Sequence, residues 1–197
     1  PGLDRVIPPR PEQHMGSHDH EPFIIQREVD AVMVPSGHEI KLQPGLAGFI
    51  SQALGGSFTL YIEGNLYRPA GSDADAIGKE PMRVPELPPN ATEEDVKRLA
   101  WEQMKTCYDP EIPVNIVDLG LIYDCDVTAN EDGTRRVEVK MTLTAPGCGM
   151  GEVLVQDVRE KIEQIPTVKQ ADVELVFDPP WRREMMSPAA QLQTGMY

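Results

Sequence analysis

The spacing of apolar residues changes once within a short stretch, and this change most constrains the fold. Over 137–144, apolar and polar residues alternate, which is typical of a strand with one buried face. After Gly151, apolar residues recur at helical spacing until Pro166 ends the pattern. The letters between these two patterns, TAPGCGMG, contain a proline, three glycines and Cys148. The sequence therefore predicts a strand, a tight turn and a helix, with Cys148 at or just before the start of the helix.

Cys148 has the setting of a reactive thiol. Unpaired backbone N–H groups and the positive end of the helix dipole favour the thiolate, which attacks electrophiles and binds metals. The surrounding glycines allow a ligand to approach the backbone closely. The alternative is a small apolar residue buried in a loop, as most free cysteines are. The lack of bulky neighbours favours the functional interpretation.

Charge and cysteine usage exclude several classes of function. The formal net charge of −14 argues against a nucleic-acid partner or an anionic membrane surface, which both require clustered Lys and Arg. No apolar stretch has the length of a membrane span, and no secretory signal is recognisable. Cys107, Cys125 and Cys148 form no Cys-x-x-Cys pair, which argues against a self-contained zinc site. We expect a cytoplasmic protein with reduced cysteines and no membrane or nucleic-acid partner.

Composition divides the chain into five segments. Residues 1–20 are polar and without period, and 14–17 resemble a cloning junction, so we expect a disordered or artificial leader. Residues 21–70 alternate short apolar runs with Gly-Gly and Gly-Asn turns, which predicts a small all-β module whose role is interaction or dimerisation. Residues 71–90 contain clustered prolines and predict a linker. Residues 91–180 form the second domain, and 181–197 form a C-terminal tail.

The second domain is predicted to be α+β. Thr92 is a good helix N-cap, and Asp95 completes a variant of the capping box. A helix, a strand from 119 to 127, the 137–143 strand, the helix after Gly151 and a strand over 171–177 follow in order. This αββαβ arrangement places helices on one face of a three-stranded sheet. Cys107 and Cys125 fall on apolar faces and are expected in the core.

A proline-containing acidic loop precedes the first strand of this domain. Asp109 and Glu111 lie in the loop, and Asp118 lies where the strand is expected to start, near the end of the second strand. Thr142 and Thr144 are expected on one face of that second strand, just before the cysteine turn. A thiolate with nearby carboxylates and hydroxyls forms a ligand set suited to iron. Solvated loop carboxylates are the alternative.

Three motifs in the expected order resemble a known family. They are DPEIP at 109–113, DLGLI at 118–122 and TLTAPGC at 142–148. They resemble the iron–sulfur assembly accessory domains that include PaaD and the small cytosolic assembly factor of eukaryotes, over about residues 92–180. The β module, the Asp-Ala-Asp-Ala linker and the Cys-Gly-Met-Gly turn are similar to the SufT-like, SUF-associated members. In many relatives proline follows the cysteine, whereas here Gly149 follows.

The resemblance implies that Cys148 is the functional cysteine and a cluster or iron ligand. It also implies that further residues line the same site: Asp109, Glu111, Asp118, Thr142, Thr144, Gly147 and Gly149. One cysteine cannot hold an iron–sulfur cluster alone. We therefore expect a transient iron–sulfur cluster shared with a second subunit, as in a homodimer, with a partner protein or with a small thiol.

The first hypothesis is an iron–sulfur cluster assembly or carrier protein that is not an enzyme. Its partners would be SUF-type assembly proteins and apo iron–sulfur target proteins. The second is a cysteine-dependent thiol-transfer or redox enzyme, which the absence of histidine from the second domain and of an adjacent resolving cysteine argues against. The third is a non-catalytic adaptor in which the site is vestigial and the β module and tail bind partners.

Overall fold

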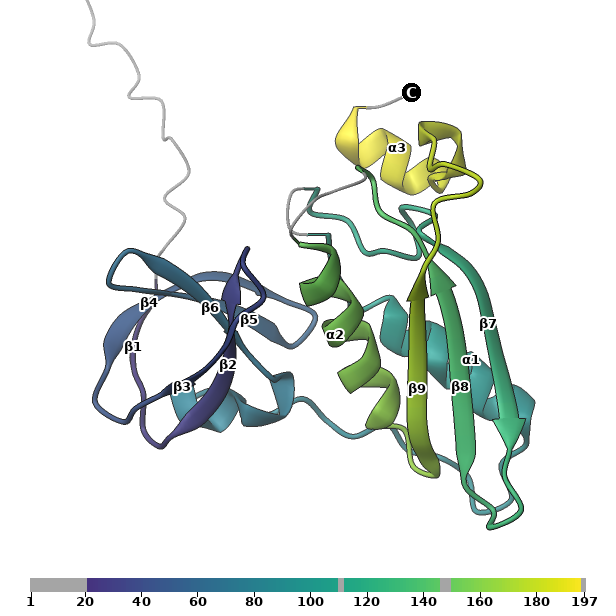
Figure 1. Cartoon of the computed structure of the whole chain (residues 1–197), viewed down its shortest axis with the longest axis horizontal. Helices are drawn as coiled ribbons and strands as arrows, with labels where there is room; N and C mark the ends of the chain where they lie inside the picture. The colour runs from purple at the N-terminus through teal and green to yellow at the C-terminus, as the bar shows by residue number, and fades with distance from the viewer. Residues whose placement is uncertain (1–20, 110–111, 146–149, 196–197) are drawn as a thin grey trace, which may run out of the picture.

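The computed structural model describes residues 21–109, 112–145 and 150–195 and contains two sheets that lie on either side of helix α2 (Figure 1). The first sheet is antiparallel throughout, with strand order β1-β4-β5-β6-β2-β3. Its strands are β1 Glu21–Ile24, β2 Val29–Val34, β3 Glu39–Leu42, β4 Ala47–Leu54, β5 Ser57–Ile62 and β6 Asn65–Pro69. The prediction of an all-β module is confirmed. Gly55 and Gly56 both have positive φ, as a tight hairpin between β4 and β5 requires.

The segment after this sheet differs from the predicted linker. Residues Gly71–Ile77 form the 3-10 helix η1, and Ala76 and Ile77 are buried in the core of the β module. Arg27 fixes this helix from outside, with ion pairs of 2.7 Å to Asp73 and 2.6 Å to Asp75. The small side chains of the Asp-Ala-Asp-Ala sequence allow close packing, and its carboxylates meet a cation. Within the described residues, the connection without regular structure begins only after η1.

The second sheet carries the αββαβ unit. Its elements are α1 Glu93–Met104, β7 Ile122–Ala129, β8 Arg135–Met141, α2 Gly151–Glu163 and β9 Val168–Leu175. Strand β8 lies between β7, to which it is antiparallel, and β9, to which it is parallel. Helix α1 packs against β7 and α2 against β9, and the helices contact each other, so both cover one face of the sheet (Figure 1). The predicted α+β class is confirmed.

Alternation in the sequence explains which face the helices cover. Val137, Val139 and Met141 of β8 are buried under the helices, whereas Glu138 and Lys140 lie on the open face. At the start of α1, the Thr92 hydroxyl accepts a hydrogen bond from the Asp95 N–H, and the Asp95 carboxylate accepts one from the Thr92 N–H. The predicted capping box is therefore present.

Several predicted strand boundaries are wrong. The third strand, expected over 171–177, spans Val168–Leu175. The strand expected from residue 119 begins at Ile122, because Gly120 has a φ of +72° in a turn that precedes it. The strand expected over 137–143 ends at Met141. Beyond it the alternation fails, since Thr142 and Leu143 are both buried. Thr142 and Thr144 therefore do not share a strand face.

The C-terminal tail belongs to the core of this unit. It forms a 3-10 helix, η2 Arg183–Met185, and a short helix, α3 Pro188–Thr194, beyond the carboxyl ends of β8 and β9 (Figure 1). Met186 and Ala190 are 3% and 2% exposed and join the same apolar cluster as α1 and α2. A domain boundary at 180 would separate these residues from the core that they fill. In the described part of the chain, no helix has the length and apolar character needed to cross a membrane.

Candidate functional site

Three backbone hydrogen bonds fold the segment after α1 onto the end of β8. Ile116 N donates to the Cys107 carbonyl at 2.9 Å, and Leu121 N donates to the Ile116 carbonyl at 2.9 Å. Thr142 N then donates to the Leu121 carbonyl at 2.8 Å. The loop that contains Asp109 and Asp118 therefore lies at the sheet end where β8 leads toward the cysteine turn.

Asp109 is a buried carboxylate at the start of this loop. It is 6% exposed, and its Oδ1 accepts a hydrogen bond of 2.9 Å from the Ile112 N–H. Its own N–H donates to the Val114 carbonyl at 3.2 Å. The carboxylate thus stabilises a turn in which two prolines remove backbone donors. This contact gives Asp109 a structural role, whatever chemistry takes place nearby.

Asp118 forms a reciprocal pair with Asn115. The Asn115 amide donates to the Asp118 carboxylate at 2.6 Å, and the Asp118 N–H donates to the Asn115 side-chain oxygen at 2.9 Å. The pair closes the turn that leads to Gly120. Sequence reasoning missed Asn115, although polar side chains three residues apart before a glycine are a recognisable turn signal.

Thr142 carries a hydroxyl that is buried at the end of β8. The residue is 1% exposed, and its Oγ1 has no hydrogen-bond partner among the described residues. A buried polar group without a partner costs about 1–3 kcal/mol. Thr144, two residues closer to the cysteine turn, is half-buried. The Thr142 hydroxyl is therefore a free donor and acceptor, relative to the described residues, at the end of β8.

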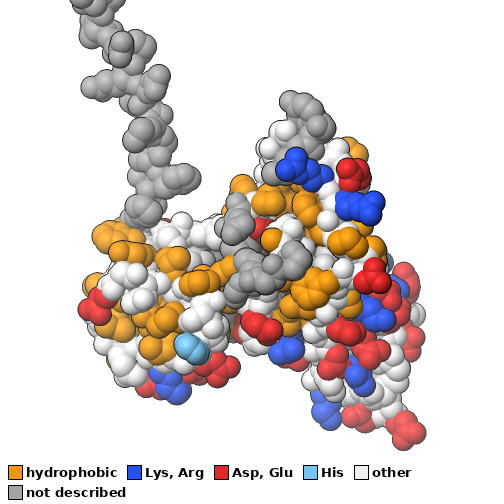
Figure 2. All heavy atoms as spheres, turned by 45° about the horizontal axis from the view of Figure 1, so that its top comes forward, with side chains coloured by type: hydrophobic (Ala, Val, Ile, Leu, Met, Phe, Trp, Pro, Cys, Tyr) orange, Lys and Arg blue, Asp and Glu red, His pale blue; other side chains and the backbone are white. Residues whose placement is uncertain are grey.

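Four expected site residues, Glu111, Gly147, Cys148 and Gly149, lie outside the described residues. Their described neighbours Pro113 and Met150 line one groove of about 750 Å³. Its other lining residues come from the β module: Val34, Pro35, Ser51, Gln52, Ala53, Leu54, Thr59, Leu66 and Arg68. Figure 2 shows hydrophobic side chains gathered on the surfaces of both units on this side of the molecule. The loop after α1 and the start of α2 thus border the same hollow.

The two other cysteines are poor ligands as they stand. Cys107 and Cys125 are 0% and 1% exposed, which confirms that both lie in the core. Burial raises the pKa of the Cys107 thiol well above its usual range and that of Cys125 to about 11. Both therefore remain protonated near neutral pH. Within the described residues, no three His, Cys, Asp or Glu side chains are grouped so that they could hold a metal ion.

The tail covers the loop from outside. Trp181 Nε1 donates to the Leu119 carbonyl at 2.8 Å, and Ser187 N donates to the Asp118 carbonyl at 2.7 Å. A Cβ on Gly120 would overlap the Met185 carbonyl oxygen, so only glycine allows this approach. These contacts clamp the Asp118–Gly120 turn between the sheet and the tail.

Comparisons with known proteins agree on the second unit. A family model described as iron–sulfur cluster assembly protein matches residues 98–175. A Porphyromonas gingivalis protein named Fe-S protein maturation auxiliary factor is 49% identical over 104 residues, covering 53% of this chain and 91% of the relative. The Bacillus subtilis auxiliary factor YitW is 38% identical, covering 53% and 98%. The Staphylococcus aureus auxiliary factor SufT is 38% identical, covering 45% and 96%.

These matches include nearly all of each relative but only about half of this chain. The family model begins within α1 and ends with β9, so it leaves the β module outside. The match to the S. aureus protein spans 88 residues, too few to include both units. These matches therefore do not test the expected similarity of the β module to SufT-like proteins.

Proposed function

We propose that this chain, which belongs to the iron–sulfur cluster assembly protein family, holds an iron–sulfur cluster transiently and passes it to apo-proteins. An accessory role in iron–sulfur assembly follows from the family and from relatives named maturation auxiliary factors. A further relative, 26% identical over 82 residues, is named an iron–sulfur cluster carrier protein.

The observation that carries the proposal is the meeting of two features, the acidic loop and the Thr142 hydroxyl, at the end of β8. The backbone bonds from Cys107 through Leu121 to Thr142 place the acidic loop beside the end of β8. The Thr142 hydroxyl is buried there without a partner among the described residues. Cys148 follows six residues later and supplies the ligand in this proposal. A buried hydroxyl beside a thiolate-bound cluster would donate a hydrogen bond to sulfur, which adjusts the stability of the cluster.

The remaining site residues take different parts in this proposal. Asp109 and Asp118 hold the loop in shape through their bonds to Ile112 and Asn115. Glu111 and Thr144 contribute further polar groups in this proposal, and glycine at positions 147 and 149 adds no side chain that would obstruct a cluster. The chain itself performs no catalytic turnover.

A single ligating cysteine per chain makes sharing of the cluster necessary. The raised pKa values of Cys107 and Cys125 argue against their serving as the other ligands. The remaining coordination then comes from a second copy of the chain, a partner or a small thiol. SUF-type assembly proteins and apo iron–sulfur targets are the proposed partners, and the reducing cytoplasm is the proposed compartment.

Anaerobic reconstitution with iron and sulfide tests Cys148 as the ligand. Wild type would be compared with Cys148→Ala and with Cys107→Ala and Cys125→Ala, which also remove one thiol each. Visible cluster absorption should disappear only in Cys148→Ala, and iron counting should give less than one full cluster per chain. Equal absorption in Cys148→Ala and wild type would overturn the proposal. Absence of a cluster in all four proteins, with glutathione and assembly partners supplied, would favour an adaptor role instead.

A further inference from the structure

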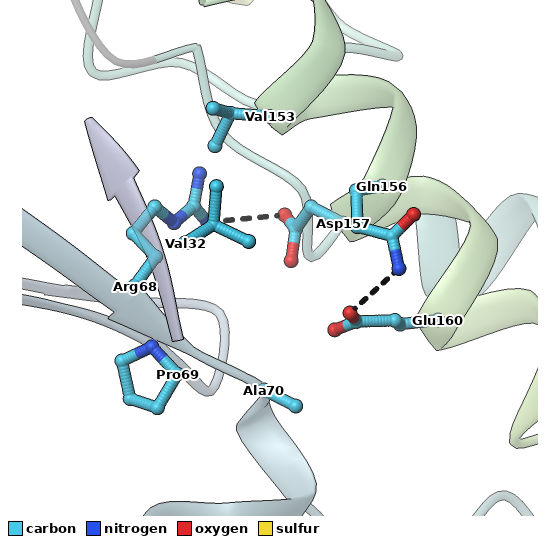
Figure 3. Close-up of a pocket in the computed structure, with 8 residues that line it drawn as sticks. All are labelled: Val32, Arg68, Pro69, Ala70, Val153, Gln156, Asp157 and Glu160. Carbon is cyan, nitrogen blue, oxygen red and sulfur yellow. Dashed lines mark hydrogen bonds and ion pairs between the residues drawn. The ribbon is translucent and has the colours of Figure 1, made fainter. Parts of the chain in front are cut away.

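A buried cluster of charged and polar groups joins the β module to α2. We call this cluster the hub and define it as Ser57, Arg68, Asp157, Lys161 and the Thr106 carbonyl. The Ser57 hydroxyl donates to Asp157 Oδ1 at 2.8 Å, and Arg68 Nη2 lies 3.4 Å from Asp157 Oδ2. Figure 3 shows Arg68 extending from the β module toward Asp157 on α2. The side chains of Arg68 and Asp157 are only 14% and 10% exposed.

Lys161 extends this cluster toward the candidate site. Its side chain is 1% exposed, and its Nζ lies 3.4 Å from Asp157 Oδ2, one helical turn away. The same Nζ donates a hydrogen bond of 2.7 Å to the Thr106 carbonyl. Thr106 follows α1 and directly precedes Cys107, whose carbonyl accepts the first of the bonds that fold the Asp109 loop.

The β module also contacts this turn through its backbone. Gly55, in the β4–β5 hairpin, has a φ of +59°, and a Cβ there would overlap the Thr106 carbonyl oxygen. Thus the carbonyl that accepts from Lys161 is covered by the hairpin that precedes Ser57. The β module therefore contacts the Thr106 turn directly through the Gly55 hairpin and indirectly through the hub residues Asp157 and Lys161 of α2.

Apolar packing alone would hold two units together at a lower free-energy cost than a hub of buried charges. Burying charged groups costs several kcal/mol per ion, and well-packed apolar residues often serve as well or better for stability. What the hub adds is directional bonds to one particular carbonyl. We infer that Asp157 and Lys161 are positioning residues that hold the Thr106 turn, and with it the Asp109 loop, at a fixed place relative to α2. The β module sets their geometry through Ser57 and Arg68. Where this concerns cluster binding, it rests on the proposed function.

The β module is accordingly part of the support of the site. The relatives that match only about half of this chain would then need other contacts to hold the same loop, or would hold it less firmly. In this chain, weakening the hub should loosen the loop before it unfolds either unit.

Hydrogen exchange of the cluster-free protein tests this inference directly. The probes are the N–H groups of Asp109, Ile112 and Ile116, which all donate within the loop. Lys161→Met removes the ammonium group but keeps most of the buried stem, and Asp157→Asn removes the opposing charge. Lys97→Met and Asp172→Asn are matched controls, because their exposed ion pairs with Asp126 and Arg136 lie away from the hub.

We expect Lys161→Met to increase exchange at the three loop amides about tenfold or more, with no such increase in either control. Ser57→Ala should give a smaller increase in the same amides, and Ser51→Ala, whose hydroxyl donates to Thr59 within the β module, should give none. The triple variant Arg68→Met/Asp157→Asn/Lys161→Met separates positioning from folding. Asp157→Asn alone leaves Arg68 and Lys161 without their shared carboxylate, whereas the triple variant removes both cations. The melting temperature of the triple variant should therefore recover relative to Asp157→Asn, whereas loop exchange should stay fast because the Thr106 carbonyl still lacks its donor.

Loop exchange equal to that of the controls in Lys161→Met would overturn the inference, as would full recovery of slow exchange in the triple variant. These readings use protein without a cluster and so do not depend on Cys148. Loss of the cluster in Cys148→Ala together with unchanged loop exchange in Lys161→Met would leave the proposed function standing and reject the positioning role. Altered loop exchange together with a retained cluster in Cys148→Ala would do the reverse.

Discussion

At the residue scale, the site combines carboxylates that already have partners with a buried hydroxyl that has none among the described residues. Asp109 bonds the Ile112 N–H and Asp118 bonds the Asn115 amide, so both help to shape the loop. The Thr142 hydroxyl differs, because it is buried and unpartnered among the described residues. A free energy cost of this kind is retained most readily at sites where a ligand later supplies the missing partner.

Thr142→Val tests this interpretation, because valine keeps the shape and removes the hydroxyl. Removing an unpaired buried hydroxyl should leave the free energy of unfolding unchanged or raise it by about 1 kcal/mol, as measured by urea unfolding of the cluster-free protein. The reconstituted cluster should be lost faster than from wild type. Thr128→Val, at an exposed position of β7, is the control. A Thr142→Val protein that is destabilised and keeps the cluster normally would show that the hydroxyl has only a structural role.

At the element scale, the tail and the loop form one structure. The Gly120 turn can approach Met185 only because it lacks a Cβ, and Trp181 and Ser187 bond the neighbouring carbonyls. The second unit therefore extends beyond the strand at which the family model ends. A tail held this way keeps the Asp118 turn in a single conformation.

Gly120→Ala should separate the tail from this turn. Both the positive φ and the overlap with the Met185 carbonyl oppose an alanine, so the free energy of unfolding should fall by about 1–3 kcal/mol or more. Gly133→Ala is the matched control, since Gly133 has a φ of +80° but open space around its Cβ position. The difference between the two variants in chemical denaturation measures the overlap alone. Equal losses would mean that the approach of Met185 contributes nothing.

Local sequence patterns predicted most helices and strands, but they failed where tertiary contacts determine the end of a strand or the burial of a residue. Alternation predicted β8, helical spacing predicted α2, and the Thr92–Asp95 pair predicted the start of α1, because each depends on residues close in sequence. The early end of β8 and the burial of Thr142 depend on Leu121, which lies some twenty residues away. The acidic loop motif indicated that Asp109 and Asp118 belong to the site, but the pattern could not show that each carboxylate closes a local turn.

At the scale of the whole molecule, the two units are joined by contacts between residues far apart in the sequence, which local sequence patterns do not predict. Ser57 and Asp157 are separated by 100 residues, and each alone is an ordinary polar residue in its own element. The sequence predicted two units and a linker. In the structure, η1 packs onto the β module, and the hub joins the β module to α2. This packing creates the groove that Pro113 and Met150 border together with β-module residues. The site is therefore a product of the assembled chain.

Cluster transfer tests the central claim most directly. The reconstituted chain would be mixed anaerobically with an apo iron–sulfur protein, and the circular dichroism of the target cluster would be followed with time. We predict that the target gains its cluster as the carrier loses its own, and that Cys148→Ala supports no transfer beyond free iron and sulfide. A target that matures equally fast with Cys148→Ala as with wild type would contradict the account.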